Sequence, residues 1–395
     1  MRVRKIAILS LGIGAGHLRA AEVVHRALYD GGEDIEARTI DALDFATRWF
    51  LLLYVRPYWW MLRRAPWAWR WIFERRQARR QRATAPAWVF RHGCRAVLSQ
   101  LKAMSPQLVI ATEIGAAEIA ALGRREGVFN APILAVQTDF QTEPPWVQPE
   151  IDFYCVGSDQ AKRQLTGWGV SPHRIVTCGI PVDPAFALRF DRTELLRALG
   201  LDARRPVILV MGGGMGPAPV DEIVRSLEVC GQPLQVLAVA GRNRELRERL
   251  ERLHGHLALD LRVFGWTDNI PELMAASDLL ITKPGGLTTS EALAAGLPMI
   301  LTHPIPGPEE RHLNYLKGLG AAVATRRVEK VPKAVSALLR DAQGLKAMSQ
   351  RAREVARPDA AHAVAQVARA LLDKETFIDL LAAPPSRSGE SAYLM

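Results

Sequence analysis

Residues 263–300 read VFGWTDNIPELMAASDLLITKPGGLTTSEALAAGLPMI, and residues 301–314 continue as LTHPIPGPEERHLN. The run from Asp278 to Thr282 is short and apolar between polar flanks, which predicts a buried strand. A lysine, a proline and two glycines at 283–286 end it, and a helix is expected from about Thr288 or Thr289 to Ala295. Gly296 then occupies the position of a C-cap glycine. An apolar strand at 297–302 follows, so the segment predicts a βαβ unit of a doubly wound α/β fold.

The turn between this strand and this helix is a candidate phosphate site. A glycine turn at this point brings backbone N–H groups and a helix N-terminus up to a phosphate. Glu291 is expected in the first turn of the helix, where its carboxylate would suit a ribose diol. The alternative is that Pro-Gly-Gly only makes the turn and that Glu291 only favours the helix dipole. The residues of this segment leave both interpretations open.

The length and the cysteines limit the class of protein. The chain has 395 residues, which suits two domains of about 200 residues each. Its four cysteines lie far apart without a CxxC pair, which argues against a zinc site or a disulfide framework and suits a reducing cytoplasm. The N-terminus lacks the long apolar core of a signal peptide. The sequence contains no run of about eighteen apolar residues, so we expect no membrane-spanning segment.

A second glycine-rich turn lies near the N-terminus. Residues 5–11 predict a strand, residues 20–28 predict a helix, and Gly14, Gly16 and His17 lie between them. His17 is therefore expected at the carboxyl edge of a sheet, where ligands bind in open α/β folds. A histidine there can remove a proton from a hydroxyl near neutral pH. The alternative role is a bond between the start of the helix and a loop, but the glycines favour catalysis.

Strand and helix patterns alternate along the rest of this half, which predicts a parallel sheet. The further strands are expected at 108–111, 132–137, 153–156 and 175–178. Asp139 comes directly after the second of these, where it could orient a base, bind a substrate hydroxyl or only cap its loop. We predict an N-terminal Rossmann-like domain at 1–186.

The pattern restarts in the second half after a charged connection. A strand at 206–211 precedes Gly213, Gly214 and Gly216, a run that would let a diphosphate approach the backbone. Arg242 follows the next strand and could neutralise a phosphate. We predict a second Rossmann-like domain at 187–380 and a flexible tail at 381–395.

A basic, aromatic insertion at about 45–92 interrupts the first domain. Residues 48–91 hold seven of the ten tryptophans, eleven arginines and one acid, so their formal charge of +10 equals that of the chain. Tryptophan favours the membrane–water boundary, and arginine is attracted to anionic lipid. The alternatives are a core helical pair with solvated arginines or a nucleic-acid patch, and nothing resembles a nucleic-acid-reading element. We predict contact with an anionic membrane surface, and no nucleic acid, through Trp67, Trp71, Arg75, Arg76, Arg79, Arg80 and Arg82.

Several motifs between residues 6 and 324 resemble one family. They include SLGIGAGHLRAAEVV (10–24), TDF (138–140), GIPVDPAF (179–186), VMGGGMG (210–216), GWTDNIPELM (265–274), TKPGGLTTSEALAAGLP (282–298) and IPGPEE (305–310). The pattern resembles the inverting, nucleotide-sugar-dependent glycosyltransferases, a family that holds plant-type monogalactosyldiacylglycerol synthases, processive diacylglycerol glucosyltransferases and the peptidoglycan enzyme that makes lipid II. The resemblance implies a GT-B fold, in which two Rossmann-like domains face each other across a cleft.

The resemblance also implies roles for individual residues. The C-terminal half would bind a UDP-sugar and the N-terminal half the acceptor, with His17 as the catalytic base and Asp139 near it. Glu291 would hold the ribose, and the backbone around Trp266 and Thr267 would meet the uracil. Gly213, Gly214, Gly216 and Thr288 would face the diphosphate with Arg242 near it, and Glu309 and Glu310 would address the sugar hydroxyls. Gly14, Gly16 and Gly286 complete the residues expected to bind substrate or donor.

The sequence departs from the family at several positions. Glu143 and Gln148 stand where the lipid-using branch often has histidines, Pro308 replaces a glutamine, and His312 aligns with an asparagine. These differences leave the sugar and, less strongly, the acceptor open. No DxD motif lies in a donor-binding position, so no metal or other cofactor is expected, and the UDP-sugar is a co-substrate.

The first functional hypothesis is an enzyme peripheral to the cytoplasmic face of the membrane. It would transfer a hexose, glucose or galactose, from a UDP-hexose to diacylglycerol or a related membrane lipid with inversion. The alternatives are transfer of a UDP-GlcNAc-type sugar to a polyprenyl-linked wall precursor, a UDP-sugar epimerase, and a non-catalytic basic membrane-binding protein. Intact glycine motifs with His17 and Glu291 argue against the last, and the tryptophan-arginine insertion argues against an epimerase.

Overall fold

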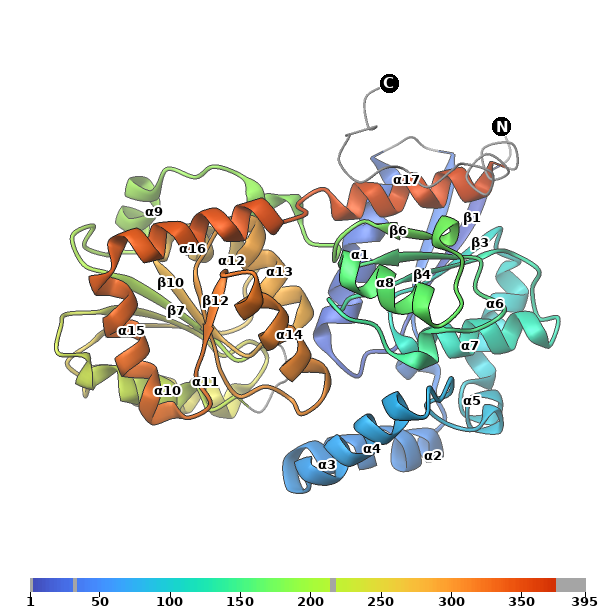
Figure 1. The fold of residues 1–395 in the computed structure, drawn as a ribbon, viewed down its shortest axis with the longest axis horizontal. Helices are drawn as coiled ribbons and strands as arrows, with labels where there is room; N and C mark the ends of the chain where they lie inside the picture. Colours follow the sequence, from blue (N-terminus) through green and yellow to red (C-terminus); the bar gives the residue numbers. More distant parts are fainter. Residues whose placement is uncertain (1–2, 31–33, 214–217, 374–395) are drawn as a thin grey trace.

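The computed structural model describes residues 3–30, 34–213 and 218–373. It has two α/β domains side by side, each built on a parallel six-stranded sheet with helices on both faces (Figure 1). This arrangement confirms the predicted pair of doubly wound domains. The tail at 381–395 lies outside the described residues, as do Gly214 and Gly216.

The N-terminal sheet has the order β2-β1-β3-β4-β5-β6. Its strands are β1 (Arg4–Ser10), β2 (Ile35–Asp41), β3 (Leu108–Ala111), β4 (Ile133–Val136), β5 (Phe153–Val156) and β6 (Ile175–Thr177). β1 pairs with β2 on one side and with β3 on the other, so the strand order reverses at β1 and β3. Ligands of open α/β sheets bind beyond the carboxyl ends of the strands at such a switch point.

The C-terminal sheet has the order β12-β11-β10-β7-β8-β9. Its strands are β7 (Val207–Met211), β8 (Gln235–Val239), β9 (Asp260–Phe264), β10 (Leu279–Thr282), β11 (Met299–Leu301) and β12 (Ala322–Ala324). Its switch point lies between β7 and β10, which pair directly. Gly213, which follows β7, therefore lies beside the Lys-Pro-Gly-Gly turn after β10.

Helices cover both sheets. Those of the N-terminal domain are α1 (Ala15–Tyr29), α6 (Arg95–Met104), α7 (Ile114–Arg125) and α8 (Asp159–Gly167), with α2 (Arg48–Phe50), α3 (Arg56–Arg64), α4 (Pro66–Ala78) and α5 (Ala87–Gly93) in the insertion. Those that follow are α9 (Arg192–Ala198), α10 (Val220–Ser226), α11 (Arg244–Glu251), α12 (Ile270–Ala276), α13 (Gly286–Ala295), α14 (Pro308–Gly318), α15 (Val331–Arg340), α16 (Ala342–Val355) and α17 (Ala360–Leu372).

The last helix corrects the predicted domain boundary at 187–380. α16 covers the C-terminal domain, but α17 returns to the N-terminal domain and packs beside α1 (Figure 1). Val364 and Ala368 of α17 are fully buried in the same apolar cluster as Ile8 of β1. The small and apolar residues of α17 complete a face of the N-terminal sheet, so the second domain ends before Ala360.

Three local expectations also need correction. β2 and β9 were not anticipated, because both are edge strands with alternating or partly exposed side chains instead of continuous apolar runs. α13 begins at Gly286, two residues before the predicted start. Glu291 therefore lies in the second turn of α13 and not in the first.

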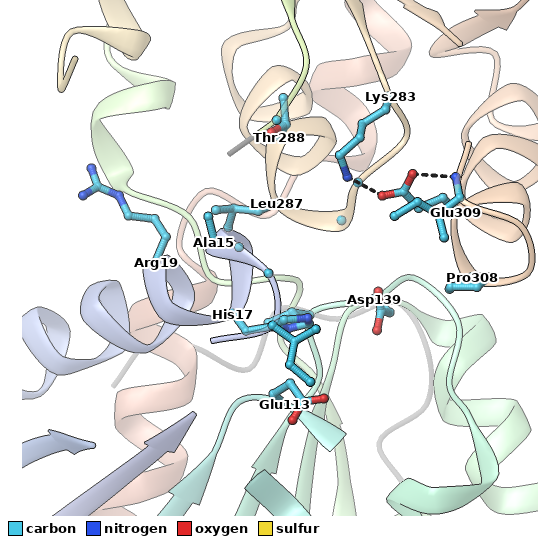
Figure 2. Close-up of a pocket in the computed structure, with 18 of the residues that line it drawn as sticks. Ala15, His17, Arg19, Glu113, Asp139, Lys283, Leu287, Thr288, Pro308 and Glu309 are labelled. Carbon is cyan, nitrogen blue, oxygen red and sulfur yellow. Dashed lines mark hydrogen bonds and ion pairs between the residues drawn. The ribbon is translucent and has the colours of Figure 1, made fainter. Parts of the chain in front are cut away.

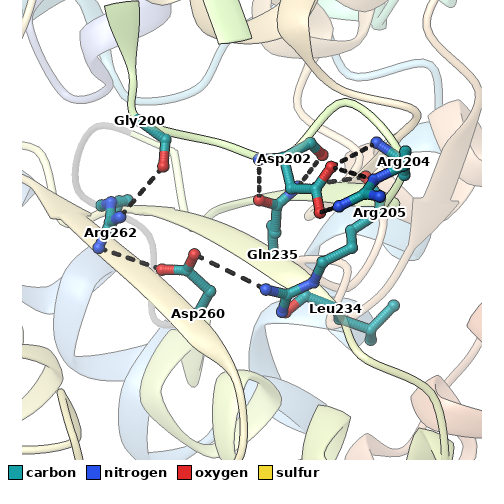
Figure 3. A network of polar contacts seen from close by, with 8 residues as sticks. All are labelled: Gly200, Asp202, Arg204, Arg205, Leu234, Gln235, Asp260 and Arg262. Atoms are coloured by element: carbon teal, nitrogen blue, oxygen red, sulfur yellow. Dashed lines mark hydrogen bonds and ion pairs between the residues drawn. The ribbon is translucent and has the colours of Figure 1, made fainter. Parts of the chain in front are cut away.

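A polar network fastens the amino ends of β8 and β9, away from the carboxyl edge of the sheet (Figure 3). The fully buried amide of Gln235 accepts a hydrogen bond from the Asp202 N–H and donates to the carbonyls of Asp202 and Arg205. Arg262 pairs with Asp260 at 3.1 Å on the next strand. These contacts satisfy buried polar groups and join the start of this domain to its sheet.

Candidate functional site

A cavity of about 570 Å³ lies between the two domains. Three parts of the chain line it: the switch point of the N-terminal sheet, the inner side of the insertion and the switch point of the C-terminal sheet. Figure 2 shows His17, Glu113 and Asp139 facing the cavity from the first domain, opposite Lys283, Thr288 and Glu309 of the second. The structure thus brings most of the predicted site residues to one place.

His17 is held in the first turn of α1. Its Nδ1 lies 2.7 Å from Thr138 Oγ1, and its carbonyl accepts a hydrogen bond from Thr112 Oγ1. Burial lowers the pKa of His17 against the opposing charge of Asp139. When Nδ1 donates to Thr138, the other ring nitrogen, Nε2, has a free lone pair. The residue is therefore arranged to accept a proton at neutral pH.

Asp139 is bound to the second domain and not to His17. Its Oδ1 lies 3.1 Å from Nε2 of His312 in α14, and Nδ1 of His312 donates to the Pro284 carbonyl at 3.0 Å. Burial opposes both charges, but the hydrogen bond and charge of the partner lower the pKa of Asp139 and raise that of His312. Both nitrogens of His312 face acceptors, so the geometry fits an imidazolium–carboxylate pair between the domains.

Glu113 is a cavity residue that the sequence interpretation missed. It caps α7 by accepting a hydrogen bond from the Ala116 N–H at 3.0 Å, and it lines the same cavity as His17 (Figure 2). Burial raises the pKa of Glu113 to about 8. Its position directly after β3, at the same switch point as His17, was the available sequence signal.

The second domain lines the cavity with Gly213, which follows β7, and with Lys283, Gly285 and Gly286, which follow β10. Gly213, with φ of +74°, faces Lys283 so closely that a Cβ would lie 2.7 Å from the lysine Cε. A Cβ on Gly286 would lie 2.1 Å from the Thr138 carbonyl, so only glycine lets α13 begin against the first domain. Glu291 is 8% exposed, and burial raises its pKa to about 7. Thr288 and Glu291 both line the cavity, as predicted for a nucleotide site.

The two glutamates of the 305–310 loop have different surroundings. Glu309 is buried, pairs with Lys283 and accepts a hydrogen bond from the Ile305 N–H, and it lines the cavity. Glu310 caps the Gly307 N–H and pairs with Arg70 of α4 at 2.5 Å, and it is not among the cavity residues. Of the two predicted sugar contacts, the geometry favours Glu309.

Some of the remaining predicted donor residues line the cavity and others do not. Gly14, Gly16, Trp266 and Thr267 line the cavity. The guanidinium of Arg242 stacks on the Trp266 ring at 4.2 Å, and Arg242 is not among the cavity residues. Gly214 and Gly216 lie outside the described residues.

The insertion has one side that lines the cavity and another that is exposed to solvent. Tyr58, Trp59, Met61, Trp69 and Ile72 line the cavity, which gives its lower part a largely apolar wall. On the outer side, Trp67 and Trp71 are 75% and 58% exposed. The arginines Arg75, Arg79, Arg80 and Arg82 are also exposed.

Arg76 corrects the predicted membrane-binding set. It is 8% exposed, pairs with Glu143 and lies 5.8 Å from the Trp69 ring. Trp69, Phe73 and Arg76 follow helical spacing on the inner side of α4, whereas Trp67, Trp71 and Arg75 follow it on the outer side. Arg76 therefore belongs to the cavity wall. Its partner Glu143 is one of the positions where the sequence departs from the family.

Neither a metal cluster nor a membrane-spanning helix occurs in the described part of the chain. No group of three or more histidine, cysteine or acidic side chains there is arranged to hold a metal ion. None of the helices at 3–30, 34–213 and 218–373 has both the length and the apolar character needed to cross a membrane.

Two families match the sequence. Residues 17–182 match monogalactosyldiacylglycerol (MGDG) synthase, and residues 191–355 match glycosyl transferases group 1. A processive diacylglycerol beta-glucosyltransferase of Bacillus pumilus is 34% identical over 220 residues, 55% of this chain and 57% of that protein. A protein of the same name from Bacillus cereus (strain 03BB102) is 32% identical over 276 residues, which are 70% of each chain.

Solved structures share the fold. MurG of Acinetobacter baumannii superposes with a TM-score of 0.61 at 16% identity, over 93% of this chain and 99% of that one. MnaA of S. aureus, solved with UDP, gives a TM-score of 0.64 at 13% identity, over 98% of this chain and 100% of that one. The likeness to these proteins confirms the expected GT-B fold.

Proposed function

The chain belongs to the glycosyltransferase family that includes the monogalactosyldiacylglycerol synthases and the processive diacylglycerol beta-glucosyltransferases, and we propose that it transfers a hexose from a UDP-hexose to diacylglycerol or a related membrane lipid. The observation that carries this proposal is the cavity. It joins an apolar wall from the insertion to a proton acceptor, His17, and to a phosphate-binding turn at the start of α13. A lipid acceptor and a nucleotide-sugar need these three features in one space.

The acceptor enters from the insertion side. Diacylglycerol has two acyl chains and one free hydroxyl, so it suits a compartment with aromatic walls that ends at polar groups. The exposed Trp67 and Trp71 with the neighbouring arginines would rest on an anionic bilayer and bring the apolar wall to the lipid. The protein would then act as a peripheral enzyme at the cytoplasmic face of the membrane.

The donor lies across the second domain. The ribose would be held by Glu291, the diphosphate would meet the N-terminus of α13 near Thr288, and the hexose would reach Glu309. The pair of Lys283 and Glu309 keeps this carboxylate in place beside the turn. The N–H groups at the start of α13 have no side-chain cap, so they are available to an anion.

The transfer is a single displacement with inversion. The acceptor oxygen attacks C1 of the hexose on the face opposite the diphosphate, and the new C1–O bond forms as the bond from C1 to the β-phosphate oxygen breaks. The electron pair of that bond leaves with UDP. The acceptor proton passes to Nε2 of His17, whose Nδ1 is fixed by Thr138.

The test measures UDP release from UDP-hexose in the presence of vesicles with and without diacylglycerol. Release that depends on diacylglycerol supports the proposal, and release that does not depend on any lipid contradicts it.

His17→Ala should lower kcat by about 10²–10⁴-fold with little change in UDP affinity. Glu291→Ala should weaken UDP binding by about tenfold to a hundredfold, because a buried charged hydrogen bond is lost. We also expect activity to persist in excess EDTA, and a loss restored only by Mg²⁺ or Mn²⁺ would show that a metal takes part.

A further inference from the structure

The cationic side chains around the cavity differ in how strongly carboxylates pair with them. Three residues with permanently cationic side chains, Arg19, Lys283 and Arg76, line it within the described chain. Lys283 is paired with Glu309, and Arg76 is paired with Glu143. Both of these pairs lie at or below 15% side-chain exposure, so neither cation is free to follow a new anion.

Arg19 differs from the other two. Its Nη1 lies 3.4 Å from Glu22, one turn along the same helix, and 4.0 Å from Asp268 of the second domain. Both carboxylates are largely exposed, so these contacts hold the guanidinium weakly. The side chain of Arg19 is itself 32% exposed.

The position of Arg19 is at the donor half of the cavity. The charge of Arg19 acts on Glu291 and lowers the pKa of that carboxyl against the effect of burial. The start of α1 also touches the start of α13, since a Cβ on Gly16 would lie 3.4 Å from the Leu287 Cβ. Figure 2 shows His17 and Arg19 leaving α1 in different directions, so one rigid helix carries both side chains.

We infer that Arg19 binds the diphosphate of the donor from the N-terminal domain and stabilises UDP as it leaves. This inference rests on the proposed function, because it requires a UDP-sugar on α13. Arg19 and Thr288 line the same cavity, and a diphosphate would be a stronger partner for this guanidinium than the present carboxylates, because its contacts with those are weak and exposed. The bond from C1 to the β-phosphate oxygen breaks towards this charge, so Arg19 acts where negative charge develops. A nucleotide held in this way is in contact with both domains.

The test compares UDP with uridine, which lacks the diphosphate, by calorimetry on the full chain. Arg19→Ala should weaken UDP binding by about tenfold to a hundredfold and change uridine binding by less than about twofold. Arg19→Lys should retain more UDP affinity than Arg19→Ala. The kcat should also fall less in Arg19→Lys than in Arg19→Ala. Arg26→Ala is the matched control, because Arg26 lies on the same helix, pairs with Asp183 and does not line the cavity. It should bind both ligands as the wild type does.

The outcomes separate this inference from the proposed function. A wild-type protein that binds neither UDP nor a UDP-hexose contradicts both. UDP binding that is the same in the wild type and in Arg19→Ala overturns the role of Arg19 and leaves the proposed function intact. An equal loss of UDP and uridine binding also overturns it, because Arg19 would then support the nucleoside side of the site. Thermal unfolding of each variant shows whether the fold is retained.

Discussion

The ion pair of Asp139 and His312 should be a pH-dependent contact between the two domains. His312→Asn removes the imidazolium and leaves Asp139 partly buried without its partner. The pair joins the loop after β4 to α14, with the Phe140 ring packed 5.1 Å from Tyr315 beside it. We expect His312→Asn to lower the free energy of unfolding.

The magnitude follows from the burial of the two side chains. His312 is 3% exposed and Asp139 is 23% exposed, so water screens only one end of the pair. Breaking a fully buried pair costs about 3–5 kcal/mol. The partial exposure of Asp139 and the remaining hydrogen bond of an asparagine reduce this figure, so we expect about 2 kcal/mol.

The pH dependence has a definite sign. The pKa of His312 is raised, so its contribution is complete below its unfolded value of 6.5 and is lost as the pH rises through the folded value. The pKa of Asp139 is lowered, so its contribution is present above 3.8 and is lost only as the pH falls through the folded value. Both contributions are therefore present at pH 6.

The assay is a double-mutant cycle of Asp139→Asn and His312→Asn, with urea unfolding at pH 6 and at pH 9.5. We expect a coupling energy of about 2 kcal/mol at pH 6 and a smaller coupling energy at pH 9.5. A coupling energy that is equal at both pH values, or absent at pH 6, would refute the ion pair.

Three further predictions concern other parts of the molecule. The pKa of Glu113 is raised from 4.5 to about 8, so the folded state keeps a proton that the unfolded state releases, and stability should fall as the pH rises between these values. Glu113→Gln should reduce this pH-dependent decrease in the free energy of unfolding by a few kcal/mol. A melting temperature that depends on pH in the variant as it does in the wild type would contradict this prediction. Gln235→Ala removes three hydrogen bonds of a buried amide and should cost about 3 kcal/mol of unfolding free energy without a change in UDP affinity. Loss of UDP binding in this variant while it remains folded would show that the network acts on the site. Replacing Trp67 and Trp71 by alanine should reduce sedimentation with anionic vesicles, and salt should weaken the binding of the wild type. If the double variant sediments as the wild type does, these rings do not contact the bilayer.

Much of the fold was open to prediction because its central strands are continuous apolar runs. β7 and β10 are buried along their whole length, and the glycines that follow them mark the carboxyl edge. The edge strand β2 could not be found in this way, because every second residue at its start faces solvent. The return of α17 is also invisible locally, since its alanines fit either domain and only tertiary packing decides between them.

The site was predictable where one glycine turn holds the residue. His17 and Glu291 lie on helices that begin at such turns, and both line the cavity. Contacts between distant segments were not predictable. The pairs of Asp139 with His312 and of Arg76 with Glu143 depend on how the domains and the insertion meet. The sequence places Arg76 among solvated arginines, and only the direction of its face on α4 moves it inside.

Identification of a lipid product is the most direct test of the central claim. The protein is incubated with radiolabelled UDP-glucose or UDP-galactose and vesicles that contain diacylglycerol and anionic lipid, and the extracted lipid is separated and its anomeric configuration determined. We predict a hexosyl-diacylglycerol with a configuration opposite to that of the donor, formed by the wild type and about 10²–10⁴-fold more slowly by His17→Ala. A product with retained configuration would contradict the single displacement. No labelled lipid from either donor, with a folded protein that binds UDP, would contradict diacylglycerol as the acceptor.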